Sequence, residues 1–128
     1  WEGISMARPA SRSRETALAV AGLLDEHKAT DTVVLDLAEV SSIADYFVIA
    51  TARSSAHLAG LARELAEALD GIGVRPRHAH KKVDASGWLL VDCGDVVVHL
   101  MDNERREFYD LERLWFRAGK VSYSSKFS

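Results

Sequence analysis

The sequence predicts one α/β domain with a mixed five-stranded sheet, two main helices and a short C-terminal helix. Three stretches, the last of them short, carry apolar residues at the helical period, and five short runs have the composition of strands, in the order α-β-β-α-β-β-β-α. Two strands separated by a helix supply a parallel pair, whereas a tight hairpin near the C-terminus must be antiparallel. A sheet that contains both arrangements is mixed.

The first half of the chain contains one helix and two strands. Ser13 is expected to cap a helix that runs to about Lys28, with apolar residues at i, i+3, i+4 and i+7 (Ala17, Val20, Ala21 and Leu24). The β-branched run at residues 32–37 predicts a strand, as does the run at 46–52. Because residues 46–52 are apolar on both faces, this strand is expected in the middle of the sheet.

A second helix follows, with Ser54 or Ser55 as its cap and Gly71 and Gly73 at its end. It has the clearest apolar stripe in the chain (Leu58, Leu61, Ala62, Leu65 and Leu69). The next run, "VRPRHAHK", predicts a strand that Pro76 confines to an edge of the sheet.

The stretch "GWLLVDCGDVVVHLM", residues 87–101, predicts a β-hairpin. A two-residue turn at Cys93-Gly94 places Asp92 opposite Asp95 and Trp88 opposite His99. Period-two alternation then gives an aliphatic face (Leu89, Val91, Val96, Val98 and Leu100). The opposite face, called the mixed face below, carries Trp88, Leu90, Asp92, Asp95, Val97, His99 and Met101.

The run "DNERREFYDLERLW" predicts the closing helix, with Asp102 or Asn103 as its cap and Phe108, Leu111 and Trp115 on one face. Two full helices cannot easily cover both faces of five strands, so part of the sheet is expected to remain for a partner. The residues leave three interpretations of the mixed face open: a face covered by a helix, a protein-binding face, and a catalytic site.

Composition and charge exclude several classes of protein. The chain has 128 residues, 48% of them hydrophobic and 27% charged, which is typical of one globular domain. A net charge of -3 implies no attraction of the whole chain to nucleic acid or anionic lipid. Because it has one cysteine, Cys93, no apolar run long enough to span a membrane and no signal peptide, we expect a cytoplasmic protein.

The two ends of the chain are expected to lie outside the domain. The residues "WEGIS" precede Met6 and are interpreted as an expression remnant, so residues 1–12 form a predicted disordered segment. Residues 118–128 lack any periodic pattern and are predicted to be a flexible tail. The predicted domain is therefore residues 13–117.

No motif establishes catalysis, a metal site or a cofactor. Asp92 and Asp95 form a carboxylate pair, but aspartates beside a glycine turn are also common turn formers. His78 and His80 point to one side of a strand without a third ligand nearby, and Cys93 has no neighbouring base.

Two further stretches bear on binding to phosphate or nucleic acid. "ATARSSAH" links a strand to a helix without the glycine that a phosphate loop needs. The basic residues around His78 (Arg75, Arg77, Lys81 and Lys82) suit either a solvated edge strand or contact with phosphate.

Three collinear segments, "VVLDLAEVSSIADYFVIATARSSAHL", "GWLLVDCGDVVVHLM" and "REFYDLERLW", resemble the ribosomal silencing factor S family, also called the Iojap family. The resemblance runs from about Asp31 to Trp115. It implies an α/β fold related to nucleotidyltransferases but without their Gly-Ser loop and Asp-x-Asp pair, so no enzymatic activity is expected.

The resemblance also implies a partner. Members of the family bind the large ribosomal subunit through ribosomal protein L-fourteen, block joining of the small subunit when nutrients are scarce, and tend to form homodimers. Organelle relatives are linked to assembly of the large subunit. The alternative function is therefore an assembly factor, or an RNA-binding module that uses residues 75–82 and contacts ribosomal RNA.

The hairpin is expected to carry the protein-binding site (Trp88, Leu90, Asp92, Cys93, Gly94, Asp95, His99 and Met101). Two residues depart from the family pattern: Ala52, which is followed by Arg53, stands directly after "AT" where a glycine is usual, and Cys93 occupies a turn position where tyrosine or leucine is common. If Cys93 packs on the partner, its contact is smaller than theirs.

Overall fold

The computed structural model describes residues 10–37, 44–75, 78–79, 87–109 and 119–120. Within these residues the chain forms three helices and one mixed sheet, which confirms the predicted class. The elements are α1 (Ala10–Glu26), β1 (Thr30–Asp36), β2 (Tyr46–Ala52), α2 (Ser55–Gly71), β3 (His78–Ala79), β4 (Trp88–Asp92), β5 (Val96–Asp102), α3 (Asn103–Tyr109) and β6 (Gly119–Lys120).

The sheet has six strands, in the order β3-β4-β5-β2-β1-β6, and not the five that the sequence predicts. Four longer strands form its centre, and β3 and β6 add two residues each at its edges. β6 pairs with β1 and lies in the segment predicted to be a flexible tail, so the sheet extends beyond the predicted bound at residue 117. A strand of two residues, glycine and lysine, has no periodicity for a sequence pattern to detect.

β2 lies in the middle of the sheet, as its apolar sequence predicts, and pairs in parallel with β5 from Tyr46↔Val96 to Ala52↔Asp102. The other strand pairs are antiparallel. Alternation along β2 divides its side chains between two clusters: Val48 and Ala50 belong to the larger buried cluster, whereas Phe47 and Ile49 belong to the smaller one.

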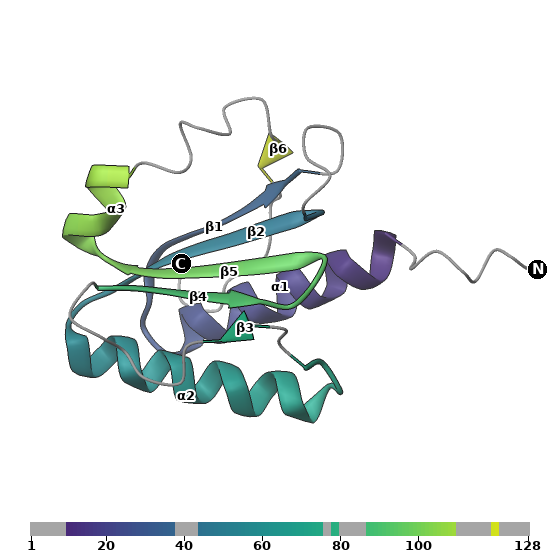
Figure 1. The fold of residues 1–128 in the computed structure, drawn as a ribbon, viewed down its shortest axis with the longest axis horizontal. Helices are drawn as coiled ribbons and strands as arrows, with labels where there is room; N and C mark the ends of the chain where they lie inside the picture. The colour runs from purple at the N-terminus through teal and green to yellow at the C-terminus, as the bar shows by residue number, and fades with distance from the viewer. Residues whose placement is uncertain (1–9, 38–43, 76–77, 80–86, 110–118, 121–128) are drawn as a thin grey trace, which may run out of the picture.

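Both main helices pack on the same face of the sheet (Figure 1). Their buried residues join the larger cluster (Ala17, Val20, Ala21 and Leu24 from α1; Leu58, Leu61, Leu65 and Leu69 from α2). α3 contacts β5 and β2 from the opposite face, where Arg106 donates a hydrogen bond of 2.9 Å to Thr51 Oγ1. Among the described residues, no helix has the length and apolar character needed to cross a membrane.

The ends of α2 agree with the sequence, whereas the start of α1 does not. Ser54 caps α2 by accepting a hydrogen bond of 3.0 Å from the backbone N–H of His57, and Gly73 follows its end with φ +75°. α1 begins at Ala10, three residues before the predicted cap at Ser13. Ser13 is a buried residue within α1, and its hydroxyl contacts Asp45 and Asp95, as described below.

Other predictions fall partly outside the described residues. Of the predicted edge strand, the structure describes His78–Ala79 in β3, which lies at the edge of the sheet; Pro76 is not among the described residues. Of the predicted apolar face of the last helix, Leu111 and Trp115 also lie outside them. Phe108 is described and is 78% exposed, so it does not join a core within this region.

Candidate protein-binding surface on the β4–β5 hairpin

The β4–β5 hairpin has a different turn from the predicted one. Trp88 lies opposite Met101, Leu90 opposite His99, and Asp92 opposite Val97. The two residues of the turn are therefore Gly94 and Asp95, closed by a 2.9 Å hydrogen bond from Cys93 N to Val96 O.

The turn moves because Gly94, at φ +91°, takes the left-handed conformation that glycine tolerates. The register differs from the predicted one by two residues. A shift of two leaves every strand side chain on its predicted face, whereas a shift of one would exchange the faces.

The aliphatic face of the hairpin is core, as predicted. Its five residues belong to the larger buried cluster, beneath α1 and α2 (Leu89, Val91, Val96, Val98 and Leu100). The prediction succeeds because one face holds only hydrocarbon side chains, and such a face must be covered to be removed from water.

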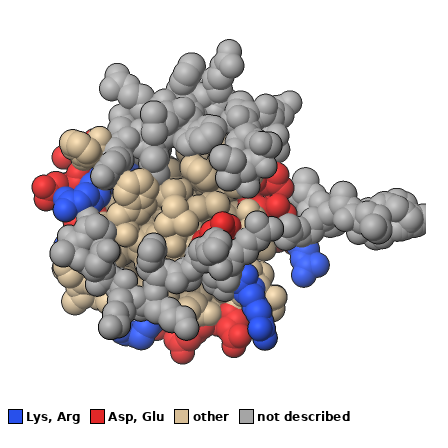
Figure 2. Space-filling model, viewed as in Figure 1, with Lys and Arg blue, Asp and Glu red and all other residues tan. Residues whose placement is uncertain are grey.

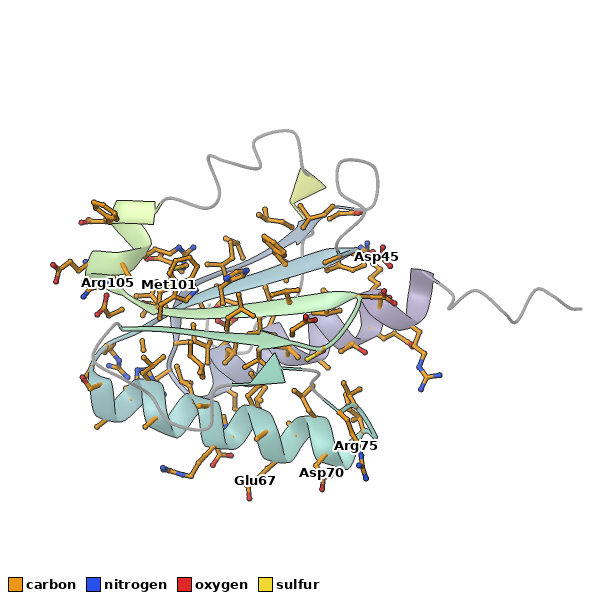
Figure 3. All side chains as sticks on the ribbon, in the orientation of Figure 1. Asp45, Glu67, Asp70, Arg75, Met101 and Arg105 are labelled. Carbon is orange, nitrogen blue, oxygen red and sulfur yellow. The ribbon has the colours of Figure 1, made fainter. Side chains whose placement is uncertain are left out.

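The mixed face is more buried than we expect of a protein-binding surface. His99 is 4% exposed and Met101 is fully buried, where it packs with Leu35, Leu37, Ile49 and Trp88. Figure 3 labels Met101 at the end of β5 where α3 begins. The prediction that His99 and Met101 offer contact surface is wrong for this conformation. Trp88, Leu90 and Asp92, all on β4, remain half-buried.

His99 joins the aromatic residues of the mixed face. The Trp88 indole Nε1–H donates a hydrogen bond of 3.2 Å to His99 Nδ1, and the Phe47 ring meets the imidazole edge to face at 4.7 Å. Burial lowers the pKa of His99 from 6.5 to about 4, so the ring is neutral at pH 7. Because Nδ1 accepts a hydrogen bond, the proton is on Nε2, which has no hydrogen-bond partner among the described residues.

The two aspartates of the hairpin hold its turn in place. Asp92 Oδ1 accepts a hydrogen bond of 2.8 Å from Gly94 N, and the Asp95 carbonyl accepts from the N–H groups of Asp45 and Tyr46 at 2.7 and 3.0 Å. Both aspartates are half-buried. The Asp92 side chain therefore acts as a turn former, one of the two roles that the sequence left open, whereas these contacts of Asp95 are made by its backbone.

Cys93 faces the helices and not the mixed face. It is half-buried and packs against the larger cluster. Burial, and then the negative charge of Asp92, raise the pKa of its thiol from 9.0 to about 11, so it carries no thiolate at pH 7. The Cys93 side chain therefore packs within the domain, on the helix side of the turn.

Ser13, Asp45 and Asp95 meet beside the turn, an arrangement that sequence reasoning missed. The Ser13 hydroxyl lies 3.4 Å from Asp45 Oδ2 and 3.4 Å from Asp95 Oδ2, and it can donate to one of them at a time. Figure 3 shows Asp45 at this end of the sheet. Asp45 and Asp95 lie 32 and 82 positions from Ser13 along the chain, so no pattern of neighbouring residues predicts the contact.

The remaining candidates for chemistry gain no support. Of the predicted H-x-H pair, His78 is in β3 and His80 lies outside the described residues, as do Arg77, Lys81 and Lys82. Arg75 is described and exposed. Within the described part of the chain, no group of three or more histidine, cysteine and acidic side chains is placed to hold a metal ion.

Comparison with known proteins identifies the family of this chain. Residues 10–126 match the family model described as "Ribosomal silencing factor during starvation". The chain is 37% identical over 95 residues to ribosomal silencing factor RsfS of Bacillus subtilis, covering 74% of this chain and 80% of that protein.

Two further similarities extend the comparison. The chain is 37% identical over 95 residues to the mouse protein named "Mitochondrial assembly of ribosomal large subunit protein 1", of which it covers 42%. A crystal structure of a Chromobacterium violaceum protein matches with a TM-score of 0.73 and 27% identity, over 94% of this chain and 97% of that one. The chain belongs to the ribosomal silencing factor (RsfS) family.

Proposed function

We propose that this protein represses translation by binding ribosomal protein L-fourteen on the large ribosomal subunit and blocking, by its bulk, the joining of the small subunit when nutrients are limited. Membership of the silencing-factor family supports a ribosomal role. The docking site is assigned to the β4 side of the mixed face and the adjoining turn (Trp88, Leu90, Asp92, Gly94 and Asp95), which is called the docking surface below. All five residues are half-buried.

Trp88 is the observation that carries the assignment. A tryptophan combines a large apolar area with few rotatable bonds, and such residues dominate the energy of many interfaces. The hydrogen bond to His99 holds the indole in one orientation before the partner arrives. A side chain that is already ordered loses less conformational entropy on binding.

His99, Met101 and Cys93 take supporting roles in this proposal. His99 orients Trp88, Met101 packs beneath it, and Cys93 supports the turn from the helix side. Asp92 and Asp95 add negative charge to the docking surface, which favours a basic partner such as a ribosomal protein. In Figure 2, uncharged side chains occupy much of the middle of the view, and most of the described charged residues lie around its edge.

The proposal extends to the wider behaviour of the protein. It acts in the cytoplasm, forms a homodimer when free, and needs no cofactor, metal or catalytic step, because occupation of a surface is sufficient to prevent subunit joining. The relation of its fold to the nucleotidyltransferases also stays a prediction.

A Trp88→Ala variant tests the assignment. We expect its affinity for purified large subunits to fall by more than about 1 kcal/mol, or fivefold, because the interface loses its anchor. Co-sedimentation of labelled protein with large subunits measures the affinity, and a subunit-joining assay measures the consequence. Leu23→Ala is the matched control, because Leu23 is a partly buried apolar residue of α1 beneath the other face of the sheet. A folded Trp88→Ala variant that binds like the control contradicts the docking surface.

A role in large-subunit assembly is the second candidate, and the name of the mouse relative favours it. In the RNA-binding form of this alternative, residues 75–82 contact ribosomal RNA. Charge reversal of Arg75 and Arg77 should then abolish subunit binding and flatten its dependence on salt. Under the main proposal the same variant binds with only a modest loss, so the two candidates are separated by one titration at several salt concentrations.

A further inference from the structure

A cavity that the docking proposal does not use lies where β2 and β5 end. Its volume is about 560 Å³. Arg53, Ser54 and Ser55, which follow β2, line one wall, and Asp102, Asn103 and Glu104, at the end of β5 and the start of α3, line another. The volume falls in the range of sites that hold small molecules, roughly 300–1,000 Å³.

The cavity follows from the topology of the sheet. β2 and β5 are parallel neighbours whose last pair is Ala52↔Asp102. The chain leaves β2 into α2 on the aliphatic face, but it leaves β5 into α3 on the mixed face (Figure 1). Where the connections of two adjacent parallel strands turn to opposite faces, a crevice opens beyond their carboxyl ends, and this is a recurrent place for ligands in α/β sheets.

Arg53 gives the first wall a positive charge. Its guanidinium is exposed and makes no ion pair or hydrogen bond among the described residues. Hydrogen bonds hold its backbone in place: Arg53 N donates one of 2.9 Å to His57 Nδ1, and His57 Nε2 donates one of 2.8 Å to the His27 carbonyl. The Ser54 hydroxyl is occupied as the cap of α2, whereas Arg53 and the Ser55 hydroxyl line the cavity.

The second wall offers hydrogen-bond acceptors. Asp102 already has contacts within the protein. Its Oδ1 accepts a hydrogen bond of 2.8 Å from Arg105 N. Its carboxylate also lies against Gly87, where the Cβ of any other residue would overlap it. Asn103 and Glu104 are exposed, and the Glu104 carboxylate lies 3.6 Å from the Arg105 guanidinium. An amide and a carboxylate both accept hydrogen bonds from hydroxyl groups.

We propose that this cavity binds a small phosphorylated polyol, a molecule of the sugar-phosphate class. Its phosphate contacts Arg53 and Ser55, and its hydroxyls contact Asn103 and Glu104. The forked guanidinium matches a phosphate group in geometry as well as charge. A ligand with hydroxyls fits the second wall better than a bare anion, which Glu104 would repel. The inference stands apart from ribosome docking, so failure of either leaves the other intact.

A titration followed by NMR tests the proposal. Isotope-labelled protein is titrated to about 10 mM, a range that detects millimolar affinities, with ribose 5-phosphate, inorganic phosphate, ribose and L-serine in separate arms. We expect ribose 5-phosphate to give saturable shifts at residues 53–55 and 103–104, and inorganic phosphate to shift the first set with weaker affinity. Absence of saturation, equal affinity for bare phosphate, or tighter binding of L-serine overturns the proposal.

Matched variants locate the binding. Arg53→Gln should weaken ribose 5-phosphate about tenfold, because it removes a charge-assisted hydrogen bond. Arg63→Gln is the control, since Arg63 is an exposed arginine of α2 that does not line the cavity, and its affinity should match wild type. Equal losses in both variants would show a general charge effect and would reject the site. Amide spectra of each variant confirm that the fold is retained.

Discussion

The two faces of the central sheet are built from the same strands but have different chemistry. Adjacent residues of β5 show this: Leu100 and Met101 are both fully buried, yet they belong to separate clusters on opposite faces. The face under α1 and α2 is held by hydrocarbon side chains. Among the described residues, the mixed face combines buried apolar side chains (Leu35, Leu37, Ile49, Val97 and Met101) with the Trp88–His99 hydrogen bond and the Arg106–Thr51 hydrogen bond.

The difference separates stability from recognition. A hydrocarbon face gains free energy from burial in proportion to its area and is insensitive to pH. A face with buried polar groups depends on hydrogen bonds with defined geometry, and each group left without a partner is unfavourable. The half-buried tryptophan is on the second face. The comparison therefore assigns the larger share of stability to the helix-covered face, whereas the proposed docking surface lies at the edge of the other.

The largest expected effect is on the helix-covered face. Leu100→Ala should lower the free energy of unfolding by about 2–5 kcal/mol, because it leaves a cavity among side chains that cannot fully rearrange. Urea denaturation measures the change. Met101→Leu, a volume-conserving substitution at the neighbouring position, should lower it by less than about 1.5 kcal/mol. If Leu100→Ala is the milder of the two, the assignment of stability to this face is wrong.

The second effect is a dependence of stability on acidic pH that His99 gives to the mixed face. The pKa of His99 is about 4 in the folded protein and near 6.5 when unfolded, so the unfolded chain binds more protons between these values. Stability should therefore fall as the pH falls from 6.5 to 4, by about 3 kcal/mol in total. Urea denaturation at a series of pH values tests this. His99→Phe should remove most of the slope and His27→Gln should retain it.

The smallest expected effect concerns the hydrogen bond that orients the anchor. Trp88→Phe keeps an aromatic ring but leaves His99 Nδ1 without its donor, which should lower stability by about 1–2 kcal/mol. In a background that already carries His99→Phe, the same substitution should have a smaller effect, because there is no acceptor left to lose. A double-mutant cycle gives the coupling between the two residues. A coupling of zero would show that the hydrogen bond contributes nothing.

Much of the fold and part of the candidate site were predictable. Periodicity predicts the class and the order of the three helices and five of the strands. It also predicts the two faces of the hairpin, because side chains alternate with a period of two and a register error of two residues leaves each side chain on the same face. The face on which Trp88, Leu90 and Asp92 of β4 lie was predictable for the same reason. The burial of His99 and Met101 was not, since a sequence shows which side chains share a face but not what covers that face.

Local pattern by itself determined the elements, the all-aliphatic face and the membership of a family whose motifs are continuous along the chain. Only the tertiary structure decided the relations between distant segments. It brought Ser13 to Asp45 and Asp95, paired Gly119–Lys120 with β1, and sent α2 and α3 to opposite faces so that a cavity opened between the ends of β2 and β5. The physical reason is that periodicity reflects the backbone geometry of one segment, whereas contacts across the chain depend on how several segments pack at once.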